Sequence, residues 1–427
     1  MYIPFFMHIV KGVRRVEKLV RGLITRYNRN TNMPHEHASQ PHHEKPQNPF
    51  AGPETALKRS DVRKPAAELR EQPLISFGSA TEASRNHPDR NEDELFTDAA
   101  RGIGGVFDGV GGVPAGDLAS RAAARELEDR ALDAAVRNAI NTDEAIYATE
   151  VARVFESPAD AELTEQDVER AMDAMLRRMN DATLREAQTN PQVRMRAIQV
   201  FIKRYKKIDS KSPADLKRLK HIQESLACTA SIFKTWNDAN GGSHLTVGQV
   251  GDSRIYRLRG QELERLTRDD SYVETLIDYG LVKDDQDVDQ KIDVEALKGF
   301  AVVDPECAEL VKVIEELGLK RPSLGHIRNL MTKSIGMEHP GGSLKLVPQV
   351  RTYDLREGDV VLVVSDGISD NLRDDEIQAI LQKHREDPIA ACDELVRMAQ
   401  VRAQTISHAR AKADDMTAVI LRRGTRH

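Results

Sequence analysis

The stretch Val360-Val361-Leu362-Val363-Val364-Ser365-Asp366-Gly367 decides the fold of this chain. Five consecutive apolar residues, four of them β-branched, are typical of a strand that is buried on both faces. The three residues that follow are turn formers, so the strand ends at a turn that carries an acid. The stretch therefore predicts a buried strand that places a carboxylate at the edge of a sheet.

Three further apolar runs adjoin an acid in the same way. Residues 104–107 run into Asp108-Gly109, residues 245–250 run into Gly251-Asp252, and residues 416–421 follow directly on Asp414-Asp415. A single Asp-Gly turn is ordinary hairpin punctuation. Four acids at the ends of four apolar strands need another explanation, because a buried carboxylate is costly unless its charge is compensated.

Divalent cations would compensate these charges. Mg²⁺ and Mn²⁺ prefer carboxylate, carbonyl and water oxygens, and a glycine beside an acid lets a backbone carbonyl come close enough to bind as well. Two such ions, roughly 3.5–4 Å apart, can hold a bridging water as hydroxide and clamp a phosphoryl group. We therefore predict a site for two Mg²⁺ or Mn²⁺ ions.

The motifs stand in the order seen in the metal-dependent protein phosphatases, the PPM or type 2C serine/threonine phosphatases, and the chain resembles that family between residues 90 and 417. The matching segments are Arg90-Asn91-Glu92-Asp93, Asp108-Gly109-Val110-Gly111-Gly112, Gly251-Asp252-Ser253-Arg254, Ser365-Asp366-Gly367-Ile368-Ser369-Asp370 and Asp414-Asp415-Met416-Thr417. The resemblance implies an α+β fold, a four-layer α-β-β-α sandwich of two antiparallel sheets flanked by helices.

The resemblance also implies roles for the acids. Asp108 would bridge both metal ions, the Gly109 carbonyl would bind one of them, and Asp366 and Asp414 would bind the other; Glu92 and Asp93 would hold waters on the metals or bind them directly, and Asp252 would serve a third site. The nucleophile would then be a water activated by the two metals, with no covalent enzyme intermediate.

Two positions depart from the family pattern. Pro88 stands where many relatives carry an arginine for the substrate phosphate, so Arg85 and Arg90 are the nearby candidates for that contact. Val110 stands where some relatives carry a histidine that protonates the leaving group. The proton would then come from a water on a metal, or from His87 or His326, which are otherwise structural or solvent-facing.

The sequence divides into two short N-terminal segments and one long domain. Residues 1–33 carry seven basic residues and one acid, with apolar residues at helical spacing; they predict a basic amphipathic segment that contacts a membrane surface or a partner. A cleaved transit segment and a fraying start are the other interpretations. Residues 34–75 have the composition of a disordered polar linker. Residues 76–424 are the predicted phosphatase domain, with helical insertions near 143–226 and 281–326.

Composition narrows the function further. The net charge of −6 argues against a nucleic-acid binder, which is normally basic over a whole domain. Three widely spaced cysteines offer no disulfide framework and favour a reducing, cytoplasmic compartment, with a membrane-peripheral location through residues 1–33 as an alternative. The basic stretch 191–226 is either a docking surface for an acidic partner or a solvated helical face.

We therefore expect a metal-dependent serine/threonine protein phosphatase acting on phosphoserine and phosphothreonine proteins in signalling. A catalytically weak or inactive pseudophosphatase that binds as a regulatory module is the first alternative. A phosphohydrolase of small phosphoesters is the second, and a protein whose main functional element is the basic segment 1–33 is the third. The sequence does not indicate an oligomeric state.

Overall fold

The computed structural model describes residues 75–110, 115–128, 142–205, 212, 217, 222, 226–336, 346–405 and 407–424. The chain divides into two units, residues 1–68 and 69–427, and all described residues belong to the second. The predictions for the basic segment 1–33 and for residues 34–74 of the linker lie outside the described residues. Strand β1 begins at Ile75, the last residue of the predicted linker.

Two five-stranded antiparallel sheets form the centre of this unit. The first has the order β1-β10-β9-β6-β7, with β1 Ile75–Glu82, β10 Met416–Arg423, β9 Val360–Val364, β6 Arg254–Arg259 and β7 Glu262–Arg265. The second has the order β2-β3-β4-β5-β8, with β2 Asp93–Asp98, β3 Ile103–Asp108, β4 Ala230–Asn237, β5 Ser243–Val250 and β8 Gln349–Asp354.

The alternation of side chains along β9 explains why this strand is apolar throughout. Val361 and Val363 pack into the core that also holds Val106 and Val247 of the second sheet, between the two sheets. The other three residues of the strand, Val360, Leu362 and Val364, pack into a separate core beneath the helices. Both faces of β9 are thus covered, as a continuous apolar strand requires.

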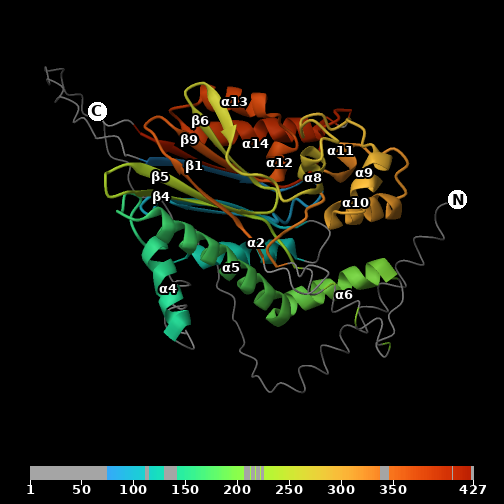
Figure 1. Cartoon of the computed structure of the whole chain (residues 1–427), viewed down its shortest axis with the longest axis horizontal. Helices are drawn as coiled ribbons and strands as arrows, with labels where there is room; N and C mark the ends of the chain where they lie inside the picture. The colour runs from blue at the N-terminus through green and yellow to red at the C-terminus, as the bar shows by residue number, and fades with distance from the viewer. Residues whose placement is uncertain are drawn as a thin grey trace, which may run out of the picture. The chain divides into compact units, whose positions relative to one another are not determined.

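Helices cover the outer face of each sheet (Figure 1). On the first sheet lie α12 Asp366–Ser369, α13 Asp374–Lys383 and α14 Pro388–Gln404. On the second sheet lie α2 Gly116–Ala124, which continues into the 3₁₀ turn η1 Arg125–Leu127, and α5 Glu165–Thr189. The predicted four-layer α-β-β-α sandwich is therefore confirmed.

The two regions predicted as helical insertions contain helices. The first region contains α4 Thr142–Phe155, α5 and α6 Pro191–Tyr205, and the chain between α4 and α5 is not helical. The Ser157-Pro158 pair disfavours helix there, and the Thr164 side chain caps the start of α5. Residues 129–141 lie outside the described part.

The second insertion forms a small helical subdomain with its own core. It contains α8 Tyr272–Asp278, α9 Val294–Phe300, α10 Pro305–Glu316 and α11 Leu324–Ile327. Leu276, Leu297, Leu310 and Ile327 are buried together in it. In the described ranges, no helix combines the length and apolar character that crossing a membrane requires.

Candidate metal centre

The topology brings four strand ends to one edge of the sandwich. β9 and β10 are antiparallel neighbours, so Asp366 after the end of β9 lies beside Asp414 before the start of β10. β2 and β3 are likewise antiparallel, and their register pairs Asp93 directly with Asp108. Asp252 lies in the turn that leads from β5 of the second sheet to β6 of the first. We call Asp93, Asp108, Asp252, Asp366 and Asp414 the acid cluster.

The backbone around Asp108 is fixed by close packing. Its amide donates to Thr229 Oγ1 at 3.0 Å, and its carbonyl accepts from the Thr229 amide at 2.7 Å. A Cβ atom on Gly109 would lie 2.5 Å from the carbonyl carbon of Gly116 and 2.7 Å from the Glu92 carbonyl oxygen. Only glycine fits at this position. The tight packing holds the Asp108-Gly109 turn beside the other acids.

Asp366 follows the end of β9 and Asp414 precedes the start of β10, and these two segments pack against each other. A Cβ atom on Gly367 would meet the Asp415 carbonyl oxygen at 1.8 Å, so the helical turn after Asp366 packs directly on the start of β10. Asp415 itself points the other way: its two oxygens accept the amides of Ser84 and Glu92, each at 2.6 Å. Asp415 thus anchors the loop before β2 and is not part of the acid cluster.

A cavity of about 170 Å³ opens between these strand ends. Four members of the acid cluster line it together with the Asp108-Gly109 turn and one lysine; the lining includes Asp108, Gly109, Asp252, Asp366, Lys412 and Asp414. Asp93 lies next to it, and its Oδ2 accepts a hydrogen bond of 2.8 Å from Ser365 Oγ.

The carboxyl pKa values in this cluster are raised. Burial, reinforced by the neighbouring carboxylates, raises the pKa of Asp108 and of Asp252 well above its usual range. Burial raises the pKa of Asp93 to about 8 against the hydrogen bonds from Thr417 and Ser365. Burial also raises the pKa of Asp366 to about 6, with Lys412 opposing and Asp414 reinforcing the shift. The cluster is therefore short of positive charge.

The atoms present fit a divalent cation. Asp93 Oδ1 and Asp366 Oδ1 are buried and have no hydrogen-bond partner among the described residues. Buried acceptors of this kind are rare in proteins unless something else satisfies them. The donor set consists of oxygens alone, which suits Mg²⁺ and Mn²⁺ rather than softer metals.

One cation from the protein does reach the cluster. Lys412 Nζ contacts the carboxylate of Asp366 and lies 2.9 Å from Asp370 Oδ2 and 3.2 Å from Asp414 Oδ2. Its side chain is only 17% exposed. No pattern in the sequence pointed to Lys412. A lysine two residues before an acid looks like an ordinary loop residue, and its partners Asp366 and Asp370 lie far away along the chain.

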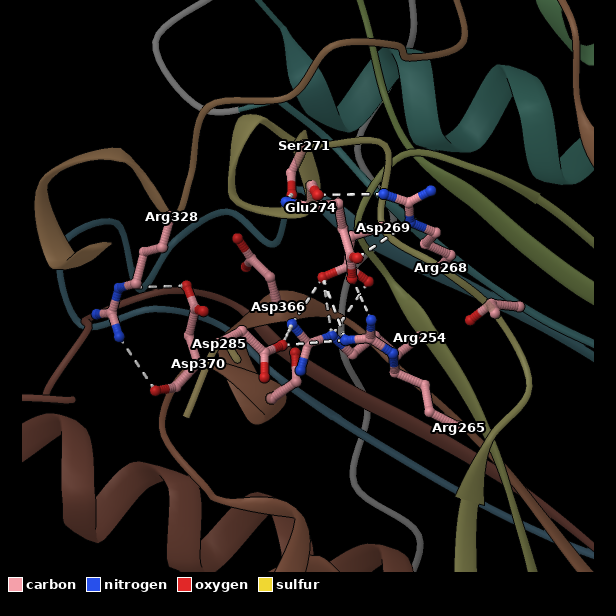
Figure 2. Close-up of polar contacts among 12 residues, drawn as sticks. Arg254, Arg265, Arg268, Asp269, Ser271, Glu274, Asp285, Arg328, Asp366 and Asp370 are labelled. Carbon is pink, nitrogen blue, oxygen red and sulfur yellow. Dashed lines mark hydrogen bonds and ion pairs between the residues drawn. The ribbon is translucent and has the colours of Figure 1, made fainter. Parts of the chain in front are cut away.

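A second set of buried charges adjoins the cluster. Arg254 binds Asp269 at 2.6 Å, and Arg265 lies 3.0 Å from Asp285; we call these four residues and Glu274, which Arg265 also contacts, the arginine network. Figure 2 shows Asp366 between this network and the pair formed by Arg328 and Asp370. The network joins β6 to the second insertion through Asp285.

The residues predicted to contact the substrate phosphate differ in their surroundings. Arg90 forms an ion pair with Glu92, 2.8 Å from Glu92 Oε1, and its side chain is 39% exposed. Arg85 is an exposed residue. Burial raises the pKa of Glu92 in spite of Arg90. Glu92, His87 and Asp415 also place possible metal-binding atoms within 4.8 Å of one another. Both Asp415 oxygens are already engaged by backbone amides, so this trio holds the loop together.

The remaining candidates have structural surroundings. His326 Nδ1 lies 2.8 Å from Ser323 Oγ and caps the short helix α11. Cys228 is fully buried, and burial raises the pKa of its thiol, so it is not poised as a nucleophile. Ser253 is buried, and its Oγ lies 2.8 Å from Thr229 Oγ1.

The fold matches solved phosphatase structures. A bacterial serine phosphatase superposes with a TM-score of 0.50 and 18% sequence identity, covering 83% of this chain and 100% of its own. The chain has the fold of the metal-dependent protein phosphatases. The resemblance inferred from the sequence is thus confirmed, at a sequence identity that shows the fold alone.

Other solved phosphatase structures are similar to the chain at lower TM-scores. The Mycobacterium tuberculosis serine/threonine phosphatase PstP/Ppp is 19% identical, with a TM-score of 0.45, 82% of this chain covered and 99% of that one. The catalytic domain of PstP in complex with two manganese ions is also 19% identical, with a TM-score of 0.46 and the same coverage. Residues 331–424 match the family model for stage II sporulation protein E, SpoIIE. A comparison with curated proteins found no match.

Proposed function

We propose that this protein is a Mg²⁺- or Mn²⁺-dependent protein phosphatase that hydrolyses phosphoserine and phosphothreonine. The observation that carries the proposal is the cavity lined by Asp108, Gly109, Asp252, Asp366 and Asp414, in which a buried carboxylate oxygen of Asp366 has no hydrogen-bond partner among the described residues. The phosphatase fold supports the same proposal, and the cavity lies at the ends of its strands.

Each acid has a role in this proposal. Asp108 would bridge two cations, the Gly109 carbonyl would bind the first, and Asp366 and Asp414 would bind the second. Glu92 and Asp93 would position waters, and Asp252 would serve a third cation. When bound, the cations would lower the pKa of a water and neutralise charge on the phosphoryl group. The protein's own contribution is to hold these oxygens rigidly at the edge of two packed sheets.

The partners would be phosphorylated proteins, since the cavity opens at the sheet edge and its lining is dominated by acids that suit a cation-bridged phosphoryl group.

All three cysteines are buried free thiols, which supports a reducing compartment such as the cytoplasm. The residue that binds the substrate phosphate is proposed to be Arg90, or Arg85 on the exposed side of the same loop.

The test is phosphate release from a phosphothreonine peptide by the full chain, with Mn²⁺, with Mg²⁺ and with chelator. Asp366→Asn should abolish metal-dependent turnover. Asp289→Asn is the matched control, because Asp289 is an exposed acid of the second insertion, and it should keep wild-type activity.

Two outcomes would redirect the proposal. Wild-type protein that binds Mn²⁺ but turns over neither the peptide nor a small aryl phosphate would favour a pseudophosphatase that acts as a binding module. Turnover of small phosphoesters in preference to phosphopeptides, measured in a competition assay, would favour a small-molecule phosphohydrolase.

A further inference from the structure

Lys412 occupies an unusual position for a lysine. Its ammonium group lies inside the acid-lined cavity, in contact with Asp366 and within 3.2 Å of Asp370 Oδ2 and Asp414 Oδ2. Nothing else with a positive charge lines that cavity among the described residues. Neither the proposed metal chemistry nor the fold comparison assigns this residue a role.

The hydrogen-bond inventory of the ammonium group limits what Lys412 can do. A lysine ammonium has three N–H donors and no acceptor. Three carboxylates surround Nζ: it donates a hydrogen bond to Asp366 Oδ2 and forms ion pairs with Asp370 and Asp414. Lys412 is therefore engaged as a counter-ion for the acids of the protein.

The backbone of Lys412 is held in place by a fully buried side chain. The amide of Lys412 donates to Asn371 Oδ1 at 3.0 Å, and its carbonyl accepts from Asn371 Nδ2 at 2.9 Å. The same Nδ2 also donates to the Gly367 carbonyl at 2.8 Å, in the turn that follows Asp366. This clamp ties the loop that carries Lys412 to the turn that carries Asp366, so their contact is part of the architecture.

Asp370 strengthens the case that this contact is built in. It lies one helical turn beyond Asp366 and also pairs with Arg328 at 3.6 Å. Burial alone would raise the pKa of Asp370, but Lys412 and Arg328 outweigh it and lower that pKa. Asp370 thus contacts the ammonium group in addition to the two acids proposed to bind a cation.

We propose that Lys412 is a built-in counter-ion that competes with the divalent cation for Asp366 and Asp414. This inference rests on the proposed function, because it concerns the second of the two cations proposed there. An ammonium and a divalent cation cannot share the same carboxylate oxygens without mutual repulsion at contact distance. The flexible four-carbon stem of lysine allows the ammonium group to withdraw when the cation binds. The cation at Asp108 and Gly109 would bind first, and the second would bind only at higher concentration.

The experiment measures Mn²⁺ binding to the full chain by isothermal titration calorimetry after removal of metal with chelator. Lys412→Met removes the charge and keeps the length of the side chain. We expect it to bind the second Mn²⁺ at least about tenfold more tightly than the wild type. Lys383→Met is the matched control, because Lys383 pairs with Glu394 on the outer helices at 2.6 Å, and it should bind as the wild type does.

A second variant guards against loss of folding, since removing Lys412 leaves three acids without their counter-ion. Lys412→Met combined with Asp370→Asn removes one positive and one negative charge and frees Asp366 and Asp414 for the cation. It should also bind the second Mn²⁺ more tightly than the wild type. Mn²⁺ should raise the Tm of both variants more than it raises the Tm of the wild type.

The outcomes separate this inference from the proposed function. Mn²⁺ binding to the wild type that neither variant alters would overturn the counter-ion role and leave the proposed metal site standing. The absence of Mn²⁺ binding to the wild type and to both variants would overturn the metal site and, with it, the competition. Tighter binding in either variant would support both.

Discussion

Two neighbouring groups of buried acids differ in how their charge is compensated. In the arginine network, Asp269 accepts hydrogen bonds from Arg254 Nε and Nη2 at 2.6 to 3.1 Å, and Asp285 contacts both Arg254 and Arg265. In the acid cluster, Asp108 is surrounded by Asp93, Asp252, Asp366 and Asp414. Burial is common to both groups, so burial alone does not distinguish them.

The pKa shifts follow this difference only in part, because burial raises the pKa of Asp269 although Arg254 and Arg265 oppose that shift. The two arginines hold the pKa of Asp285 well below its usual range, against the effect of burial. The pKa of Asp108 is raised well above its usual range, because burial and its neighbouring acids act in the same direction. A buried acid with an arginine stabilises the fold, whereas a buried acid without one costs stability and is retained for another reason. The comparison thus separates acids that pair with arginines from acids that are proposed to bind cations.

The largest effect is expected from Asp108→Asn. We expect turnover of a phosphothreonine peptide to fall by at least about 10³-fold, which corresponds to about 4 kcal/mol of transition-state stabilisation. In chelator the free energy of unfolding should stay equal or rise, because the variant removes an uncompensated buried carboxyl. Phosphate-release kinetics and urea unfolding of the same preparation measure both. A variant that is destabilised in chelator would contradict the assignment of Asp108 as a functional acid.

The opposite behaviour is expected from Asp269→Asn. Asp269→Asn breaks a buried ion pair and leaves Arg254 with Asp285 as its remaining acidic partner. Breaking a buried pair typically costs about 3–5 kcal/mol. The free energy of unfolding from urea titration should fall by that amount, with or without Mn²⁺. Asp375→Asn serves as the control: its partner Arg373 and Asp375 itself are both more than half exposed, and such pairs contribute about 0–1 kcal/mol. Equal effects of the two substitutions would break the comparison.

Lys234 shows a third form of compensation, by backbone dipoles. It is fully buried, and its Nζ donates to the carbonyls of Arg101, Ser157, Pro158 and Thr235 at 2.6 to 3.1 Å. Burial nevertheless lowers the pKa of Lys234 to about 7. Between about pH 7 and pH 10 the unfolded chain therefore binds more protons than the folded one, and stability rises with pH by up to about 1.4 kcal/mol per pH unit.

The measurement for Lys234 is urea unfolding of the wild type and of Lys234→Met at several pH values. The difference between the two free energies isolates this residue from the other titrating groups. It should rise with pH from about 7 upward and level off below, where Lys234 is protonated in both states. A difference that is flat or falls over this range would show that the four carbonyls hold the ammonium form.

The sequence predicted four of the six central strands, β3, β5, β9 and β10, and the acids at their ends for one physical reason, whereas the central strands β4 and β6 were not predicted. A strand buried on both faces must be apolar throughout, so β9 and β10 stand out, and an acid directly beside such a run is conspicuous. The strands β1, β2, β7 and β8 escaped notice because they lie at sheet edges and are only partly apolar. Their positions follow from pairing with neighbours rather than from their own composition.

The contacts of the site could not be predicted in the same way. Lys412 meets Asp366 and Asp370 across a separation of more than 40 residues, and no local pattern records that contact. The arginine network likewise depends on Asp285 reaching Arg254 from the second insertion. Asp269 and Asp108 look alike in sequence, as acids next to turns, and only the three-dimensional neighbours show which one has a cationic partner.

The smallest effect is expected from the two arginines of the loop before β2. Arg90 pairs with Glu92, next to Asp93 in the sequence, whereas Arg85 is exposed. Arg90→Gln should therefore raise the KM for a phosphopeptide by about three- to tenfold with a smaller change in kcat, because it removes a binding contact rather than a metal ligand. Arg85→Gln should change KM by less than about twofold, as exposed charges usually do. Equal effects on KM would place the substrate phosphate between the two arginines, and a larger effect of Arg85→Gln would move it to the exposed side of the loop.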